Sequence, residues 1–198
     1  MELYLIRHGP TDYNRYRRWQ GRVDIPLSPE GRSLADAVRN SLHARRVHTD
    51  LVFSSPLSRA QETARLIASD SSCVVVDDRL IEIDLGEYDG RLEDEVQQEV
   101  GKKEYELWRR GNFRTPAPGG ESFGQVQKRV GEFLGELRAS QTAPQVLIVA
   151  HQVSLMALKS VISGACSQKT LTGYRQRTDV VEVWDDFGKS CMSAWEVT

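Results

Sequence analysis

The chain has 198 residues, of which 39% are hydrophobic and 27% charged, and its formal net charge is -2. These values predict an ordinary soluble globular protein with a single domain spanning residues 1–198. A net charge so close to zero argues against nucleic acid or an acidic membrane surface as the partner.

Short apolar runs alternate with helical patterns along the first part of the chain. Residues 3–6 predict a first buried strand, and Ser28 is the predicted N-cap of a helix that follows it. Residues 51–54 predict a second strand. Ser58 and Gln61 have the spacing of a capping box, so we expect a helix to begin there.

The same alternation continues after a third predicted strand at residues 74–76. Residues 84–120 have weak apolar periodicity and end in a Pro- and Gly-rich turn, which is typical of an insertion or lid. Ser122 begins a strongly periodic helix, with Gln125 completing a capping box. Residues 146–150 predict a strand that is buried on both faces.

A helix is expected from about residue 153 to residue 163, and residues 179–185 and 190–197 predict a β-hairpin that borders the sheet. The fold class predicted from this order is α/β. We expect a three-layer sandwich with a mostly parallel central sheet flanked by helices, plus a small helical lid insertion.

The charged residues are unevenly distributed, because residues 66–108 carry 13 acidic and four basic side chains. A solvated acidic helix explains this block, although basic flanking segments that meet around an anionic site remain an alternative. Arginine also exceeds lysine, by 20 to six, and its planar guanidinium suits bidentate binding of phosphate or carboxylate.

Cysteines and apolar runs give no sign of secretion or of membrane insertion. The three cysteines, Cys73, Cys166 and Cys191, form no CxxC pair and are expected to be reduced. The apolar segment before Arg7 is too short for a signal peptide, and no apolar run approaches the roughly 18 residues of a spanning helix. A cytoplasmic location is therefore expected, with no membrane partner.

Cationic and imidazole side chains directly follow three of the predicted strands. Arg7 and His8 follow the first, Arg59 lies shortly after the second, and His151 with Gln152 follows the strand at 146–150. Ligands of open α/β sheets bind beyond the carboxyl ends of the strands, where helix N-termini also favour anions. This combination predicts a phosphate site.

Several motifs occur in an order that resembles the histidine phosphatase superfamily, the phosphoglycerate mutase-like proteins. The match covers residues 1 to about 165 and rests on independent segments, since an Arg-His-Gly triplet alone is weak. The segments are 7–14, 20–22, 27–31, 54–60, 80–82, 119–122 and 149–151.

The resemblance implies that His8 is a nucleophile that forms a phosphohistidine, which water then hydrolyses. It implies that Arg7, Arg59 and His151 surround the phosphoryl oxygens and stabilise charge in the transition state. Glu82 resembles the family's general acid, which protonates the leaving alkoxide and later deprotonates water.

The resemblance also implies a substrate-binding set, which consists of Asn14, Gln20, Gly21 and Gln152. Gln152 stands where many members have Gly, and its likeness to the His-Gln pair of fructose-2,6-bisphosphatases does not establish that substrate. Arg109 and Arg110 resemble a mutase-type substrate clamp, although an exposed basic helix end fits them equally well.

The sequence therefore predicts a metal-independent, histidine acid-type phosphomonoesterase that needs no cofactor and hydrolyses a small phosphorylated metabolite. An α-ribazole phosphatase-like specificity and a broad specificity both remain open. The enzymatic alternative is a cofactor-dependent phosphoglycerate mutase, and the non-enzymatic one is a regulatory module that binds a phosphorylated ligand. A homodimer is also left open.

Overall fold

In the described part of the chain, a six-stranded sheet forms the centre, with the strand order β3-β2-β4-β1-β5-β6. The computed structural model describes residues 1–48, 51–68, 74–109, 115–140, 144–165, 173–186 and 191–197. The strands are β1 (Glu2–Arg7), β2 (Leu51–Ser54), β3 (Val74–Val76), β4 (Gln145–Ala150), β5 (Val180–Asp185) and β6 (Cys191–Glu196).

The sheet is mostly parallel, as predicted. β1 and β2 both pair with β4 in parallel, and β3 pairs with β2 in parallel. β5 runs antiparallel to β1, and β6 runs antiparallel to β5. The predicted hairpin is therefore confirmed as the border of the sheet, and the central strand β4 is buried along nearly its whole length.

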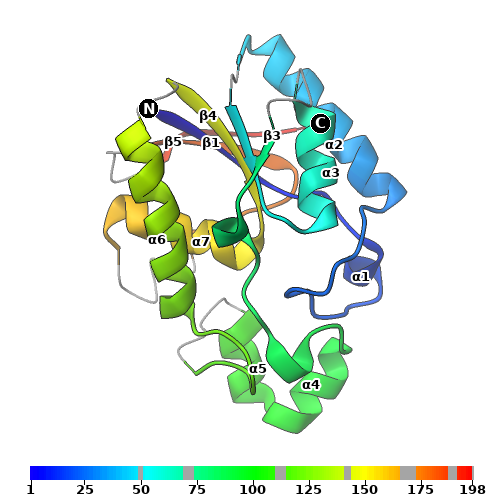
Figure 1. Ribbon diagram of the computed structural model, residues 1–198. Helices are drawn as coiled ribbons and strands as arrows, with labels where there is room; N and C mark the ends of the chain where they lie inside the picture. Colours follow the sequence, from blue (N-terminus) through cyan, green and yellow to red (C-terminus); the bar gives the residue numbers. More distant parts are fainter. Residues whose placement is uncertain are drawn as a thin grey trace.

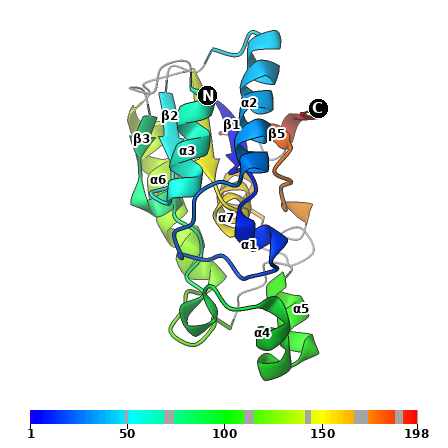
Figure 2. The same cartoon turned by 90° about the vertical axis from the view of Figure 1, so that its right-hand side faces the viewer.

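Helices cover both faces of the sheet, which confirms the predicted three-layer α/β sandwich. α2 (Pro29–Ala44) and α3 (Ser58–Ile67) lie on one side, and α6 (Phe123–Ser140) and α7 (Gln152–Ser163) on the other (Figures 1 and 2). The short helix α1 (Asp12–Arg15) follows β1. Along β1, Leu3 and Leu5 belong to the core under α6 and α7, whereas the alternate residues Tyr4 and Ile6 belong to the core under α2 and α3.

The lid region contains α4 (Glu93–Val100) and α5 (Lys102–Arg109), with the short 3-10 helices η2 (Asp78–Leu80) and η3 (Gly86–Tyr88) preceding them. α4 and α5 project from one end of the sandwich (Figure 1). Their inner side chains pack on aromatic partners, with Trp108 5.7 Å from Tyr88 and Tyr105 5.9 Å from Trp19 between ring centroids. α4 carries acidic residues in its first turn, where the helix dipole favours them.

The two predicted capping boxes have different outcomes. Ser122 caps α6 as predicted, since Gln125 Oε1 accepts a hydrogen bond from the Ser122 backbone N–H at 2.8 Å. The capping box at Ser58 is wrong, because Ser58 is already the first helical residue and Gln61 Nε2 donates to Pro56 O. A carboxylate distant in sequence replaces it: Asp24 Oδ1 accepts from the Ser58 N–H at 2.7 Å.

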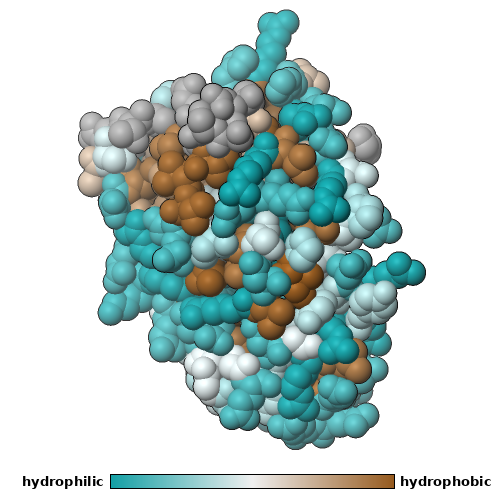
Figure 3. All heavy atoms as spheres, turned by 45° about the vertical axis from the view of Figure 1, so that its right-hand side comes forward, coloured by the Kyte–Doolittle hydropathy of each residue, from teal (hydrophilic) through white to brown (hydrophobic). Residues whose placement is uncertain are grey.

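Polar side chains cover most of the face drawn in Figure 3, and hydrophobic side chains gather there in smaller patches. Within the described ranges, no helix has both the length and the apolar character needed to cross a bilayer.

A buried ion pair joins α7 to β5. Lys159 is fully buried, and its Nζ donates to Glu182 Oε1 at 2.8 Å and to Tyr174 O at 3.2 Å. Glu182 also accepts from Trp184 Nε1 at 2.9 Å. Burial lowers the pKa of Lys159, while the carboxylate opposes that change.

We expect Glu182→Gln to lower the free energy of unfolding by about 3 kcal/mol, because it leaves the Lys159 charge buried without a counterion. Urea denaturation measures this change. Glu196→Gln is the matched control in the neighbouring strand, since its partner Arg177 and Glu196 itself are both about 60% exposed; its expected effect is within about 0.5 kcal/mol. Equal effects of the two substitutions would contradict the prediction.

Candidate active site

The hydrogen-bond ladder of the sheet continues one residue beyond the ends of its strands. The His8 N–H donates to Ala150 O at 3.1 Å, and the Ser55 N–H donates to Val149 O at 3.1 Å. These bonds bring the residues that follow β1, β2 and β4 to one edge of the sheet. His8 and His151 consequently lie with their ring centroids 4.9 Å apart.

Two neighbours determine how the imidazole of His8 is presented. Its Nδ1 lies 2.7 Å from Gly9 O, and a carbonyl accepts but cannot donate, so Nδ1 carries the hydrogen. The lone pair is then on Nε2, which accepts from Arg59 Nε at 3.3 Å. Burial, followed by the charges of Arg59 and Arg7, lowers the pKa of His8 well below its usual value. A neutral imidazole with Nε2 available is the form that attacks an electrophile.

Glycine at position 9 is required by backbone packing. A Cβ at Gly9 would lie 2.6 Å from Gly31 O, and one at Gly31 would lie 2.2 Å from Pro10 O. The loop after β1 therefore crosses the start of α2 so closely that neither position has space for a Cβ atom. Thr63 supports this loop from α3, because its Oγ1 accepts from the Gly9 N–H at 3.3 Å.

The imidazole of His151 is buried and contacts the hydroxyl of Ser55. Its Nε2 lies 2.7 Å from Ser55 Oγ, and that oxygen accepts from the Leu57 N–H at 3.3 Å. A hydroxyl both donates and accepts, so this contact fits an imidazole hydrogen on Nδ1 as well as one on Nε2. Nδ1 is buried and has no hydrogen-bond partner in the described part of the chain. Burial and the charge of Arg59 keep the pKa of His151 well below its usual value.

The guanidinium of Arg59 is fully buried and held in one orientation. Besides its bond to His8, it donates to Val23 O and Gly21 O, each at 2.8 Å. Asp89 holds the same loop, because its carboxylate accepts from the N–H groups of Gly21, Arg22 and Val23 at 2.6 to 2.8 Å. Burial lowers the pKa of Arg59.

Glu82 is buried against the N-terminus of α7. Its Oε1 accepts from the N–H groups of Ile83 at 2.9 Å and Ser154 at 3.1 Å, while Oε2 accepts from the Val153 N–H at 3.1 Å. Burial raises the pKa of Glu82, although the backbone donors and two arginines oppose the rise. Oε2 has fewer hydrogen bonds than Oε1, so it is the oxygen with room for a proton.

A second arginine fixes the backbone of Glu82. Arg129 in α6 donates to Glu82 O at 3.1 Å and to Arg79 O at 2.6 Å, and it pairs with Glu121 at 3.1 Å. Sequence reasoning missed Arg129, and it included Glu121 in the 119–122 motif without giving it a role. Nothing in the pattern distinguished Arg129 from the other arginines on amphipathic helices.

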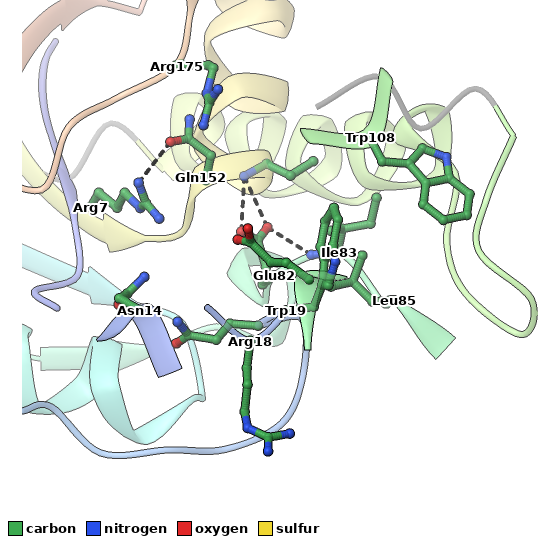
Figure 4. A pocket seen from close by; sticks show the side chains of 13 residues that line it. Arg7, Asn14, Arg18, Trp19, Glu82, Ile83, Leu85, Trp108, Gln152 and Arg175 are labelled. Atoms are coloured by element: carbon green, nitrogen blue, oxygen red, sulfur yellow. Dashed lines mark hydrogen bonds between the residues drawn. The ribbon is translucent and has the colours of Figure 1, made fainter. Parts of the chain in front are cut away.

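A pocket of about 160 Å³ opens beside Arg7 and Glu82. Five of the predicted site residues line it, namely Arg7, Asn14, Gln20, Glu82 and Gln152. Figure 4 shows Arg7, Asn14 and Gln152 arranged around the opening, with Glu82 near its centre. His8, Arg59 and His151 are buried and do not line the pocket. The wall also contains residues that sequence reasoning did not assign to substrate: Arg18, Trp19, Ile83, Leu85, Glu93, Trp108, Val153 and Arg175.

The residues predicted to bind substrate differ in their surroundings. Asn14 Oδ1 accepts from the Thr11 N–H at 2.9 Å and Gln20 Oε1 accepts from Thr11 Oγ1 at 2.7 Å, so one threonine orients both amides. Gly21 does not line the pocket, and a Cβ there would lie 2.8 Å from Ile83 O, which gives this glycine a packing role. The side chain of Arg109 and all of Arg110 lie outside the described residues, so the clamp stays a prediction.

Several side chains at the site could donate hydrogen bonds to an anion. Among the residues that the structure describes, no group of three or more His, Cys, Asp or Glu side chains could hold a metal ion. The available donors are the guanidinium groups of Arg7 and Arg59 and the imidazole of His151.

Comparison with known proteins identifies the family. The model of the histidine phosphatase superfamily (branch 1) matches residues 3–183. The chain belongs to this superfamily. The resemblance inferred from the motifs is thereby confirmed.

The relatives of this histidine phosphatase include enzymes of several names. Phosphoserine phosphatase 1 of Hydrogenobacter thermophilus is 34% identical over 83% of this chain and 77% of its own length. A protein of an Enterobacter strain named "Probable phosphoglycerate mutase GpmB" is 34% identical over 83% of this chain and 75% of its own.

Solved structures agree with the fold. The α-ribazole phosphatase of Shigella flexneri superimposes with a TM-score of 0.81 at 31% identity, covering 93% of this chain and 90% of its own. A mycobacterial glucosyl-3-phosphoglycerate phosphatase has a TM-score of 0.81 at 29% identity, covering 92% of this chain and 91% of its own.

We expect Asp89→Asn to weaken both stability and turnover of this histidine phosphatase. One amide oxygen cannot replace the carboxylate for three N–H groups, so the loop that holds Arg59 loosens. The expected loss is about 1 to 3 kcal/mol in the free energy of unfolding, with a lower kcat. Asp94→Asn is the control, because Asp94 is 70% exposed and pairs with an exposed arginine. If chemical denaturation and kinetics do not separate the two variants, the role of Asp89 is refuted.

Proposed function

We propose that the chain is a metal-independent, histidine acid-type phosphomonoesterase that hydrolyses a small phosphate monoester through a phosphohistidine on His8. The observation that carries this proposal is the fixed tautomer of His8. Its Nδ1–H is bound to Gly9 O, and its Nε2 lone pair faces Arg59 beside the pocket. The names of several relatives, which include phosphatases of different phosphate esters, support the reaction class.

In the first step, His8 Nε2 attacks phosphorus, the P–N bond forms and the P–O bond to the alcohol breaks. Glu82 Oε2 transfers its proton to the leaving alkoxide and becomes a carboxylate. Arg7, Arg59 and the Nδ1–H of His151 stabilise the phosphoryl oxygens as charge spreads over them. The Nδ1–H of His8 donates to Gly9 O throughout.

In the second step, water attacks phosphorus and the P–N bond breaks. The Glu82 carboxylate takes one proton from that water, inorganic phosphate leaves, and His8 returns to its neutral form with Nε2 unprotonated. Glu82 is again protonated, so the cycle closes. The raised pKa of Glu82 supports this double role, because a group that gives and then takes a proton works best near the operating pH.

The same experiments distinguish the phosphatase from two other functions. A phosphoglycerate mutase would return the phosphoryl group to another hydroxyl, so isomerised phosphoglycerate would exceed released phosphate. A regulatory module would bind phosphate esters without turnover. The presence of a buried acid in the pocket wall favours catalysis, because binding an anion does not require a carboxyl group.

We expect His8→Ala to reduce hydrolysis of p-nitrophenyl phosphate by at least about 10³-fold, because no other nucleophile replaces the imidazole. The melting temperature of the His8→Ala protein should stay close to that of the wild type. His43→Ala is the control, since His43 is exposed at the last turn of α2, and it should retain full activity. A folded and fully active His8→Ala protein would refute the mechanism.

We expect Glu82→Gln to depend on the leaving group. Hydrolysis of an alkyl phosphate should fall by about 10² to 10⁴-fold, and that of p-nitrophenyl phosphate much less, because nitrophenolate leaves without a proton. The raised pKa keeps Glu82 protonated at higher pH than an ordinary glutamate, so kcat/KM on alkyl phosphates should decline only above that ordinary range. This decline should be absent in Glu82→Gln.

The control for this variant is Glu87→Gln, five residues along the chain and exposed. It should leave both the rates and their pH dependence unchanged. Equal losses on alkyl and aryl phosphates in Glu82→Gln would contradict a role for Glu82 as the acid.

A further inference from the structure

Two arginines hold the main-chain carbonyl of Glu82. Arg129 donates to Glu82 O at 3.1 Å, and Arg22 donates its Nε–H to the same oxygen at 3.5 Å. Arg129 belongs to α6, whereas Arg22 lies in the loop between α1 and α2. Neither arginine lines the pocket. Whatever fixes these two guanidinium groups therefore also fixes the backbone from which the Glu82 side chain projects.

The carboxylate of Glu121 joins the two arginines. Arg129 donates its Nε–H to Glu121 Oε1 at 3.2 Å and a terminal N–H to Oε2 at 3.1 Å, an arrangement in which both guanidinium and carboxylate are fixed in direction. Arg22 lies 3.0 Å from the same Oε2. Burial raises the pKa of Glu121, but the hydrogen bond and the charge of Arg129 outweigh burial and lower it. Glu121 is therefore ionised near neutral pH.

Glu121 also binds the backbone of Asp84 from two sides, two residues after Glu82. The Glu121 N–H donates to Asp84 O at 2.9 Å, and Glu121 Oε2 accepts from the Asp84 N–H at 3.1 Å. The two segments are so close that a Cβ at Gly120 would lie 2.5 Å from Asp84 O. The backbone of residues 82–84 is thus held at both of its ends, by Glu121 itself or by the arginines that it binds.

The side chain of Glu82 extends from this fixed backbone into the pocket (Figure 4). In the proposed reaction its Oε2 gives a proton to the leaving oxygen, and proton transfer requires the two oxygens to lie within hydrogen-bond distance. A displacement of about 1 Å in a reacting group can cost about 10²-fold in rate. The rate of proton transfer therefore depends on how precisely the backbone of Glu82 is placed.

We propose that Glu121 is a positioning residue for Glu82, and that it directs Oε2 at the leaving oxygen by holding Arg22, Arg129 and the Asp84 backbone. The proposal rests on the proposed phosphatase function and adds a residue that acts through its general acid. Glu121 does not line the pocket, so it does not touch the ester. Its removal should weaken proton transfer and leave binding of the phosphoryl group unchanged.

We expect Glu121→Gln to show the same dependence on the leaving group as Glu82→Gln. The amide keeps the shape of the side chain but has one oxygen in place of two, so it cannot accept from both arginines and the Asp84 N–H as the carboxylate does. The kcat on an alkyl phosphate should fall by about 10- to 100-fold, and that on p-nitrophenyl phosphate by less than about threefold. The KM for p-nitrophenyl phosphate and the inhibition constant of inorganic phosphate should stay at their wild-type values.

A double-mutant cycle tests whether Glu121 acts through Glu82. Glu82→Gln has no proton to transfer, so adding Glu121→Gln to it should lower kcat/KM on the alkyl phosphate no further. If the two losses instead multiply, Glu121 acts independently of the acid and the proposal is overturned.

Glu136→Gln is the matched control, because Glu136 also pairs with an arginine, Arg79 at 2.8 Å, but is 73% exposed. It should keep the wild-type rates on both esters. Arg22→Gln tests the same contacts through a residue that is 36% exposed and tolerates substitution more readily than Glu121. It should show the preferential loss on the alkyl ester at a smaller size. Equal losses on both esters in either variant would contradict the positioning role.

A measurement without turnover separates this proposal from the proposed function. The 13C NMR resonance of the Glu82 carboxyl, assigned by its absence in Glu82→Gln, reports the surroundings of that group. Glu121→Gln should shift this resonance, and Glu136→Gln should not. If the wild type hydrolyses no ester, or if Glu82→Gln shows no dependence on the leaving group, the proposed function fails, but the resonance still decides the positioning. An unchanged resonance in Glu121→Gln would overturn it.

Discussion

The buried guanidinium of Arg59 connects the parts of the structure on which the site depends. Three of its hydrogen bonds reach His8, Gly21 and Val23, which lie on two separate loops. A guanidinium has a rigid fork of donors, so a displacement of any of these partners breaks a bond in a buried place where water does not replace it. The position of His8, the proposed nucleophile, and the shape of the loop at residues 21–23 are therefore set by one constraint.

That constraint extends into the lid region through Asp89. Its carboxylate accepts from three successive N–H groups of the loop that Arg59 holds, and it precedes the segment that leads into α4. The acidic middle of the chain thus has two kinds of residue. Most of the acids of α4 are solvated, whereas Glu82 and Asp89 point inward and bind backbone N–H groups. Composition alone cannot separate these kinds, because both contribute the same charge.

The site also shows how burial prepares groups for opposite tasks. Burial lowers the pKa of His8 and His151 and raises that of Glu82, so all three tend toward their neutral forms. In the proposed reaction a neutral imidazole attacks, another neutral imidazole donates, and a protonated carboxyl supplies the proton. The arginines remain charged, so positive charge at the site comes from groups that do not titrate near neutral pH.

The sequence by itself determined the layers of the fold, the strand ends and the residues most suited to phosphate chemistry. Hydrophobic periodicity fixes which face of each element is buried, and residues after parallel strands must meet at one edge, so His8, Arg59 and His151 could be placed together in advance. It failed where a partner is distant in sequence. Asp24 caps α3 in place of Ser58, and Arg129 holds the backbone of Glu82 from another helix.

The tertiary structure alone decided the tautomer of His8 and the oxygen of Glu82 that has room for a proton. Each of these depends on which atoms lie within about 3 Å of one another, and local pattern carries no information about contacts between residues far apart in the chain.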